Sequence, residues 1–177
     1  VRAAFKMLSG WASEEEMMER TEDVLKDYDF GAQRRAGLLI SEAEGAQYHT
    51  PQYEKRPEGF SDHFAGMLSW GARQPLEKVR GAYAQIAKAE ALAEEIFKTT
   101  DIILAPTAPQ EAFKFGAPIP AGQADFTAFA NFAGLPAATI PIGKGKNRLP
   151  IGVQIIGQRG RDEFVLQMAA RVRALVV

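Results

Sequence analysis

The clearest pattern of apolar and polar positions lies between Pro75 and Thr99. Apolar side chains recur there every three or four residues, while lysine and glutamate fill most positions between them. This spacing is typical of an amphipathic α-helix, in which one face packs and the other is solvated. Pro75 suits the first helical position, where no N–H is needed. The apolar positions are Leu76, Val79, Tyr83, Ile86, Ala89, Ala93, Ile96 and Phe97.

Other stretches with helical spacing are shorter or less regular. Ser13 and Glu16 form a capping-box pattern, which predicts a helix from about Glu14 to Lys26. A further helix is expected over 32–49, and Thr50-Pro51 should end it, because a proline disfavours helical backbone in the residue before it. The remaining expectations in this group are helices over 62–70 and 161–175 and a surface connection over 52–59.

Three short apolar runs have the length and composition of buried strands. They are Ile102 to Ala105, Ala137 to Ile142 and Ile151 to Ile156. The second and third are joined by residues 143–150, a turn rich in glycine and lysine. Because helices surround these few strands, the pattern predicts an α/β fold.

A loop and a short helix are expected between the first two strands. Residues 110–123 contain prolines and glycines among few charges, which predicts a loop. Asp125 can then cap a helix that runs to Ala133, with Gly134 as its C-terminal stop and Pro136 just beyond.

Composition narrows the class of protein. The 177 residues are 46% hydrophobic and 24% charged, which is ordinary for one globular domain, and the net charge of -1 offers no basic patch for nucleic acid. The chain has no cysteine, so disulfides, zinc-thiolate sites and cysteine nucleophiles are excluded. Its apolar runs are far shorter than the ~20 residues of a membrane helix. We therefore expect a cytoplasmic protein with no nucleic-acid and no membrane partner.

Residues that often carry chemistry are isolated in this sequence. His49 stands at a predicted helix end and His63 in another helix, and neither has the local carboxylate and hydroxyl of a catalytic triad, so a surface or capping role is favoured. Clustered metal ligands are missing as well. The segment 143–146 lacks the spacing of a phosphate-binding loop, which favours a hairpin turn. The glutamate runs 14–16 and 94–95 lie on exposed or capping faces, where solvation is the simpler explanation.

Three segments carry a family resemblance because they follow one another in a characteristic order. They are 102–109 (IILAPTAP), 131–138 (NFAGLPAA) and 149–157 (LPIGVQIIG). Together they closely resemble the C-terminal part of the amidase signature family, whose members hydrolyse carboxamides with a Ser, cis-Ser, Lys triad. The similarity extends from about Arg34 to the terminal helix and so covers most of the chain.

The resemblance implies that these strands belong to a mixed central β-sheet flanked by helices. It also implies a triad upstream, in a Gly/Ser-rich loop and on a preceding strand, and this sequence holds no such segment. Residues 1–177 are therefore expected to be the C-terminal portion of an amidase-signature domain whose catalytic N-terminal portion is absent. We assign no catalytic residue, no metal ligand and no cofactor to this chain.

Three residues are candidates for contact with a substrate. The pair Arg34-Arg35 is similar to a place where some family members bind a substrate carboxylate, which makes Arg35 a candidate, although a solvated pair of arginines is the simpler arrangement. Thr127 and Asn131 are one helical turn apart, so they share a face. In the family this stretch borders the active-site cleft, but Asn131 could instead satisfy backbone groups of the adjoining turn.

Three hypotheses about function remain open. The chain could be a C-terminal fragment of an amidase, which the start at Val1 favours, one part of a split hydrolase whose partner carries the triad, or a non-catalytic binding or scaffold module. The expected partner in the complete enzyme is a small-molecule amide substrate. A sheet that lacks its neighbours has open edges, so we also expect self-association or pairing with a missing N-terminal portion.

Overall fold

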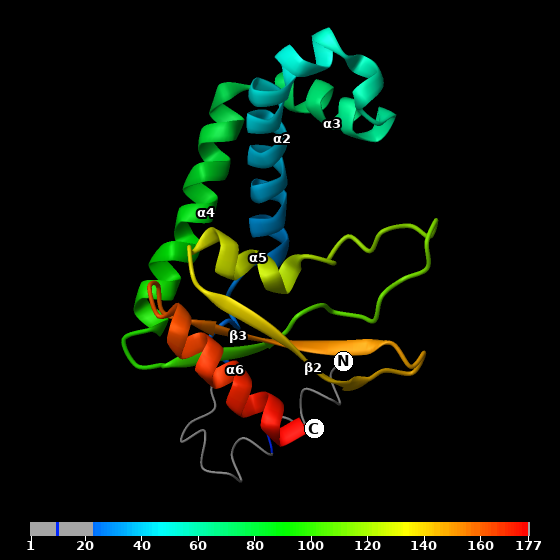
Figure 1. The fold of residues 1–177 in the computed structure, drawn as a ribbon. Helices are drawn as coiled ribbons and strands as arrows, with labels where there is room; N and C mark the ends of the chain where they lie inside the picture. The colour runs from blue at the N-terminus through cyan, green and yellow to red at the C-terminus, as the bar shows by residue number, and fades with distance from the viewer. Residues whose placement is uncertain (1–9, 11–22, 177) are drawn as a thin grey trace.

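The computed structural model describes residue 10 and residues 23–176 (Figure 1). Its elements follow the chain as α2 (Phe30–Lys55), η1 (Pro57–Gly59), α3 (Asp62–Ala72), α4 (Leu76–Ile96), β1 (Ile102–Pro106), α5 (Asp125–Phe132), β2 (Ala137–Lys144), β3 (Pro150–Gly157) and α6 (Asp162–Val176). Helices flank a small sheet, which confirms the predicted α/β class.

The three strands form one sheet in the order β1-β3-β2, and both pairings are antiparallel. Leu104 lies opposite Ile155, and Ile140 lies opposite Val153. The segment between β2 and β3 is a tight connection, in which the Gly145 N–H donates to the Leu149 carbonyl at 2.9 Å. All three predicted strands and the predicted hairpin turn are thus present. The larger mixed sheet remains an expectation about strands outside this chain.

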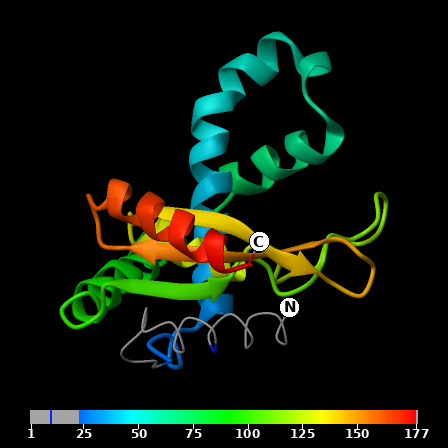
Figure 2. The same ribbon diagram turned by 60° about the horizontal axis from the view of Figure 1, so that its bottom comes forward.

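Each face of the sheet is covered by different helices (Figures 1 and 2). Successive side chains of a strand point to opposite faces, so β3 contributes to two cores. One core joins Val153 and Ile155 to the buried face of α6, whose residues there are Val165, Met168, Ala169 and Val172. The other joins Ile103 and Ile156 to helices α4 and α5, through Ala89, Ala93, Ile96, Phe129, Ala130 and Ala133. The predicted apolar faces of α4 and α6 therefore supply buried residues to these cores.

Helices α2, α3 and α4 form an arm that extends away from the sheet (Figure 1). Two glycines allow close contacts of α2 with neighbouring helices. A Cβ at Gly71 of α3 would lie 2.0 Å from the backbone oxygen of Glu42, so α3 crosses directly on the α2 backbone. A Cβ at Gly37 of α2 would lie 2.2 Å from the ring of Phe132 in α5. Side chains at either position would push the elements apart.

The prediction that Thr50-Pro51 ends the second helix was wrong. Helix α2 continues through Pro51 to Lys55, and the expected connection 52–59 consists of its last turn and the short η1 helix. Pro51 removes one backbone donor from the helix, and only the last turn of α2 follows it. The Thr50 hydroxyl donates to the Ala46 carbonyl at 2.6 Å, and the Arg56 N–H closes the final turn on Gln52 at 3.0 Å. Local bonds therefore carry the helix past the proline.

Smaller corrections concern three helix ends. The helix predicted from Glu14 to Lys26 falls mostly outside the described residues, and residues 24–27 form a turn rather than a helix. Pro75 has an extended backbone and lies at the N-cap of α4, one position earlier than predicted. Residues 97–99 form a turn after α4, so that helix ends three residues before Thr99. Helix ends depend on single local bonds, which periodicity does not encode.

Candidate functional site

Helix α5 carries two of the three predicted substrate-binding residues. It has eight residues, from Asp125 to Phe132, and an isolated helix of this length is not stable in water. Its conformation must therefore be fixed by contacts with the rest of the fold. Its buried side includes Phe129, which is fully inaccessible to solvent. The Phe129 ring packs edge-on against the Tyr28 ring, with 5.1 Å between the ring centroids. Burial raises the pKa of the Tyr28 phenol, so this contact is between neutral rings.

The first turn of α5 is held by an ion pair. Asp125 was predicted to cap the helix, but the N-cap is Ala124, which makes no side-chain cap, and Asp125 is the first helical residue. Its carboxylate instead accepts a hydrogen bond from the guanidinium of Arg34 on α2. Both side chains are about one fifth exposed, at 21% and 22%. This shielding makes the pair stronger than one at the open surface.

Gln154 ties the same turn to the sheet. Its side chain is only 2% exposed, and it lies on β3 between β1 and β2. Its Nε2 donates to the carbonyl of Phe126 in α5 at 2.7 Å and to the carbonyl of Pro106 at the end of β1 at 3.4 Å. One buried amide thus links three elements. Such a polar group is tolerated in a core because its donors are used.

The C-terminus of α5 is held by a different set of bonds. Gly134 has φ +62, and the Leu135 N–H donates to Ala130 while the Gly134 N–H donates to Asn131, the pattern of a Schellman motif. The predicted glycine stop is therefore confirmed. Arg159 adds a cation at this end, because its Nη2 donates to the Ala133 carbonyl at 2.9 Å.

Thr127 and Asn131 share one face of α5, as their spacing predicted. The Thr127 hydroxyl donates to the Ala124 carbonyl at 3.2 Å, and the Asn131 Nδ2 donates to the Thr127 carbonyl at 3.0 Å. Asn131 is exposed, and its side chain bonds to its own helix rather than to the turn that follows. The alternative that Asn131 holds that turn is therefore not what the structure shows. Its contact with a substrate stays a prediction.

The two neighbouring arginines of α2 point in different directions. Arg34 reaches α5, whereas Arg35 is exposed and its guanidinium lies 3.2 Å from the position that a Cβ on Gly31 would occupy, at the start of α2. The structure thus brings Thr127 and Asn131 together but does not join Arg35 to them. Sequence spacing did not single out Arg34, because the side of α2 that faces α5 is marked only by the contact of Gly37 with Phe132 in the structure.

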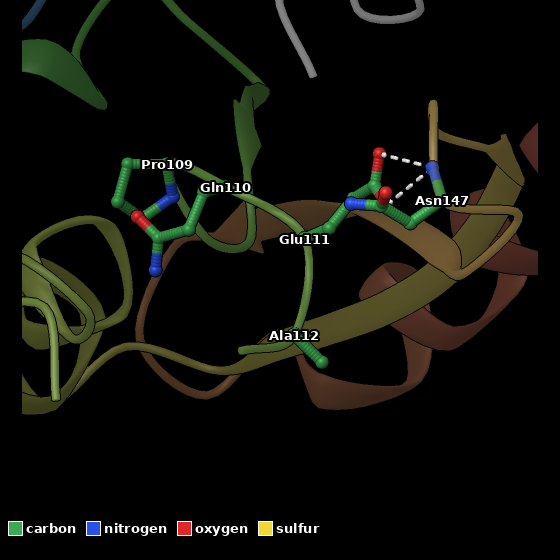
Figure 3. A pocket seen from close by; sticks show the side chains of 5 residues that line it. All are labelled: Pro109, Gln110, Glu111, Ala112 and Asn147. Atoms are coloured by element: carbon green, nitrogen blue, oxygen red, sulfur yellow. Dashed lines mark hydrogen bonds between the residues drawn. The ribbon is translucent and has the colours of Figure 1, made fainter. Parts of the chain in front are cut away.

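A hollow of about 370 Å³ lies where the loop after β1 meets the β2–β3 turn (Figure 3). The Glu111 carboxylate lines it and accepts the Asn147 N–H, at 3.0 Å to Oε2 and 3.4 Å to Oε1. Gln110 also lines the hollow, and its side chain donates to the side chain of Gln123, two residues before Asp125. This bond connects a residue that lines the hollow to the segment that leads into α5.

The histidines and two serines of the arm form no catalytic arrangement with one another in the contacts below. The His49 ring packs edge-on against the Phe64 ring, with 5.4 Å between the ring centroids, and His63 is exposed on α3. Ser61 caps α3 by accepting the Phe64 N–H, and the Ser69 hydroxyl accepts a hydrogen bond from Arg73. Within residue 10 and residues 23–176, no group of three histidine or acidic side chains is placed to hold a metal ion. In the same residues, no helix combines the length and apolarity needed to cross a membrane.

The model of the amidase family matches residues 12–166 of this chain. The chain belongs to the amidase family. Its relatives include a glutamyl-tRNA(Gln) amidotransferase component from Halothermothrix orenii, which is 36% identical over 64% of this chain and 26% of its own length. The corresponding amidotransferase component from Bacillus thuringiensis (strain Al Hakam) is 27% identical over 96% of this chain and 39% of its own length.

Solved amidase structures share the fold. A bacterial aryl acylamidase of the amidase signature family superposes with a TM-score of 0.76 and 19% identity, over 99% of this chain and 41% of the acylamidase. This amidase chain thus spans between about a quarter and two fifths of the length of these relatives. Family membership places it among proteins that act on amide C–N bonds.

Proposed function

We propose that the chain is the C-terminal portion of a cytoplasmic amidase that hydrolyses carboxamide C–N bonds, with its Ser, cis-Ser, Lys triad outside this chain. The observation that supports this most directly is helix α5. Its eight residues carry polar side chains at the surface and are held at both ends by residues 25 or more positions away. Such support is what a wall of a binding site requires.

The reaction that the family resemblance implies needs a serine nucleophile, a proton for the leaving nitrogen, and N–H groups that stabilise the oxyanion. A serine oxygen attacks the carbonyl carbon, the C–N bond breaks, and the nitrogen leaves as ammonia or an amine after taking a proton. Water then attacks the acyl-serine ester and releases the carboxylic acid. Backbone N–H groups near the serine stabilise both oxyanions. In this proposal the missing portion supplies these groups, and this chain positions the substrate.

The exposed groups of α5 suit an amide ligand. The Asn131 side chain and the Thr127 hydroxyl both present hydrogen-bonding atoms at the helix surface, and a carboxamide offers one acceptor and up to two donors. Arg35 keeps an exposed guanidinium that could pair with a substrate carboxylate. We propose these three side chains as substrate contacts in the complete enzyme, with Arg35 engaged only by substrates that carry an acid group.

The chain's own sheet supports the proposal of a missing partner. In the described residues β1 and β2 each pair only with β3, so one edge of each strand is open. Open edges favour pairing with a further strand. We propose that the preceding portion of the amidase covers at least one edge. Without it, size-exclusion chromatography should show self-association, and a monodisperse monomer would favour an independent module.

The decisive experiment compares two proteins. One is the chain alone, and the other is the chain joined to the segment that precedes it in its gene. Ammonia release from a panel of carboxamides is measured for both. The proposal expects no turnover above a blank for the chain alone and measurable turnover for the joined protein. Turnover by the chain alone, or inactivity of a folded joined protein that contains a Gly/Ser-rich loop, would contradict it.

A further inference from the structure

The two outer strands of the sheet, β1 and β2, have differently built edges. Strand β2 carries features that keep an edge strand from pairing with another strand. Its register shifts between Pro141 and Gly143, which bends the strand, Pro141 lacks a backbone N–H, and Lys144 places a charge at the strand end. On one face of β2, Ala137, Thr139 and Pro141 are all exposed, and none of them is a large apolar side chain. Strand β2 therefore suits the solvent-facing rim of a sheet.

Strand β1 has the composition of an interior strand. Its five residues, IILAP, are all apolar, so both of its faces are apolar. Its pairing with β3 keeps one register from Ile102 to Pro106, and its proline is the last residue rather than an interruption. A continuous apolar run is typical of a strand that lies inside a sheet with both faces covered. Within the described ranges, however, β1 pairs only with β3.

The backbone of β1 directs a regular set of hydrogen-bonding groups away from β3. The Thr107 N–H donates to a β3 carbonyl at 3.0 Å, and the N–H groups of an antiparallel strand alternate in direction. Ile103 and Ala105 therefore bond to β3, whereas the N–H and C=O groups of Ile102 and Leu104 point outward. In the part of the chain that the structure describes, no strand takes these groups up. Such an edge is a template for a further strand.

The sheet face above this edge is only partly covered. Helix α6 lies over β2 and β3 (Figure 2). Ile102 and Leu104 lie on the same side of the sheet as α6 and are partly buried, whereas Ile103 and Ala105 on the opposite side are buried. An added strand would satisfy the outward backbone groups but would leave this apolar face as it is. A helix packed beside α6 would complete it.

We propose that the open edge of β1 receives a strand from the preceding portion of the amidase, that a helix of that portion packs beside α6, and that β2 is an outer edge of the complete sheet. The inference rests on the proposed function, which assumes such a portion. This chain spans 41% of the aryl acylamidase, so a protein of that length has residues to supply a strand and a helix. A second copy fits less well. Paired through its own β1, it would keep its α6 over its own β2 and β3, and the face above both β1 strands would stay partly covered.

The test compares matched backbone amides on the two edges. On β1 the outward amides are those of Ile102 and Leu104. A β3 amide donates to the Pro136 carbonyl at 3.0 Å, so the same alternation places the amides of Ala137 and Thr139 outward on β2. Hydrogen–deuterium exchange is measured at single-amide resolution in the chain alone at low concentration and in the complete amidase, that is, this chain with its preceding segment.

The proposal expects all four outward amides to exchange fast in the dilute chain, while the amides between them, which bond to β3, exchange slowly. In the complete amidase the two β1 amides should slow by at least about a hundredfold, and those of β2 should change by no more than about threefold. Slowing at β2 instead of β1, or at neither strand, would overturn the proposal.

Two further outcomes would identify a different occupant and so would also overturn it. Slow exchange of the β1 amides already in the dilute chain would show that residues of this chain cover the edge. Slow exchange in the complete amidase that is lost on dilution would show that a second copy covers it, because pairing within one molecule does not depend on protein concentration.

Proline variants of the complete amidase give an independent readout. Leu104→Pro and Thr139→Pro each remove one outward N–H and keep the bonds to β3, and Leu104→Ala controls for the lost side chain. Leu104→Pro should lower the melting temperature further than Leu104→Ala does and speed exchange at Ile102 about tenfold. Thr139→Pro should change neither quantity. Equal effects of the two proline variants would mean that the edges do not differ.

The exchange experiment separates this inference from the proposed function. If the complete protein turns over amides while the outward amides of β1 exchange as fast as those of β2, the edge assignment fails and the function stands. If it turns over no amide but protects the β1 amides alone, the proposed function fails and the edge assignment stands.

Discussion

Helix α5 and the loop that leads into it are neighbours in sequence, but their support differs. The helix is held at its start by Arg34 and Gln154 and at its end by Arg159, all from other parts of the chain. The loop is held at its base, and its apolar tip, residues 113–119 (the loop tip), meets solvent. A short helix gains its stability from tertiary contacts, whereas a loop tip without them stays exposed. The comparison separates helix α5, which the fold holds in a fixed position, from the loop, whose apolar side chains remain accessible.

The largest expected effect concerns Gln154. Replacing it with Met keeps the volume but leaves the Phe126 and Pro106 carbonyls without this donor in a buried place. The free energy of unfolding should fall by about 2 kcal/mol, measured by urea denaturation with thermal unfolding as a check. Gln158→Met is the matched control, because Gln158 is exposed just after the strand. Equal stability of the two variants would mean that Gln154 does not anchor α5.

The ion pair at the start of α5 should have the next largest effect. Arg34→Met leaves the Asp125 carboxylate without its partly buried donor, so we expect a loss of about 1–2 kcal/mol in unfolding free energy. Arg35→Met, one residue away on the exposed side, should leave stability within about 0.5 kcal/mol. A double-mutant cycle with Asp125→Asn measures the pair itself. A coupling of zero would remove the ion pair from the list of anchors.

Loss of the cation at the other end of α5 should matter less. Arg159→Met removes a hydrogen bond to the Ala133 carbonyl, an exposed ion pair with Glu90 and a positive charge at a helix C-terminus, which together should lower stability by about 0.5–1 kcal/mol. Arg171→Met provides the comparison, since Arg171 is exposed on α6. The difference should shrink in high salt because the charge is partly screened. A salt-independent loss would indicate a packing effect instead.

The smallest effect on stability is expected where the chain faces solvent. Asn131→Ala and Phe115→Ser should each change the unfolding free energy by no more than about 0.5 kcal/mol, because neither side chain is buried. For Asn131, any loss of kcat/KM in the complete enzyme at unchanged stability then reports contact with the substrate. A stability loss of about 1 kcal/mol or more, the scale of a buried hydrogen bond, would show that the residue holds the fold.

Much of the local structure followed from the sequence. The apolar repeat of α4, the three strand runs and the Gly134 stop each depend on side chains close in sequence, and all were predicted. The shared face of Thr127 and Asn131 also follows from helical spacing alone. The prediction at Pro51 failed because it treated the proline as a helix end, whereas α2 continues to Lys55 and the Arg56 N–H closes its last turn on Gln52.

The anchors of α5 could not be predicted in the same way. The pair Arg34-Arg35 was recognised, but which guanidinium meets α5 depends on how α2 packs at Gly37. Asp125 looked like a cap because caps and helix-start ion pairs use the same residue type. Gln154 sits in a strand-like apolar run, where nothing local shows that its amide reaches two other elements. Contacts between distant segments determine these roles.

Hydrogen–deuterium exchange of the backbone amides tests the central claim, that α5 is a fixed platform and the loop tip is free. The account predicts that the amides of Phe129 and Ala130 exchange only through openings close to global unfolding, whereas those of residues 113–119 exchange at least about a hundredfold faster. Exchange of the α5 amides as fast as that of the loop tip would contradict it, because the helix would then lack the support that its anchors are said to provide.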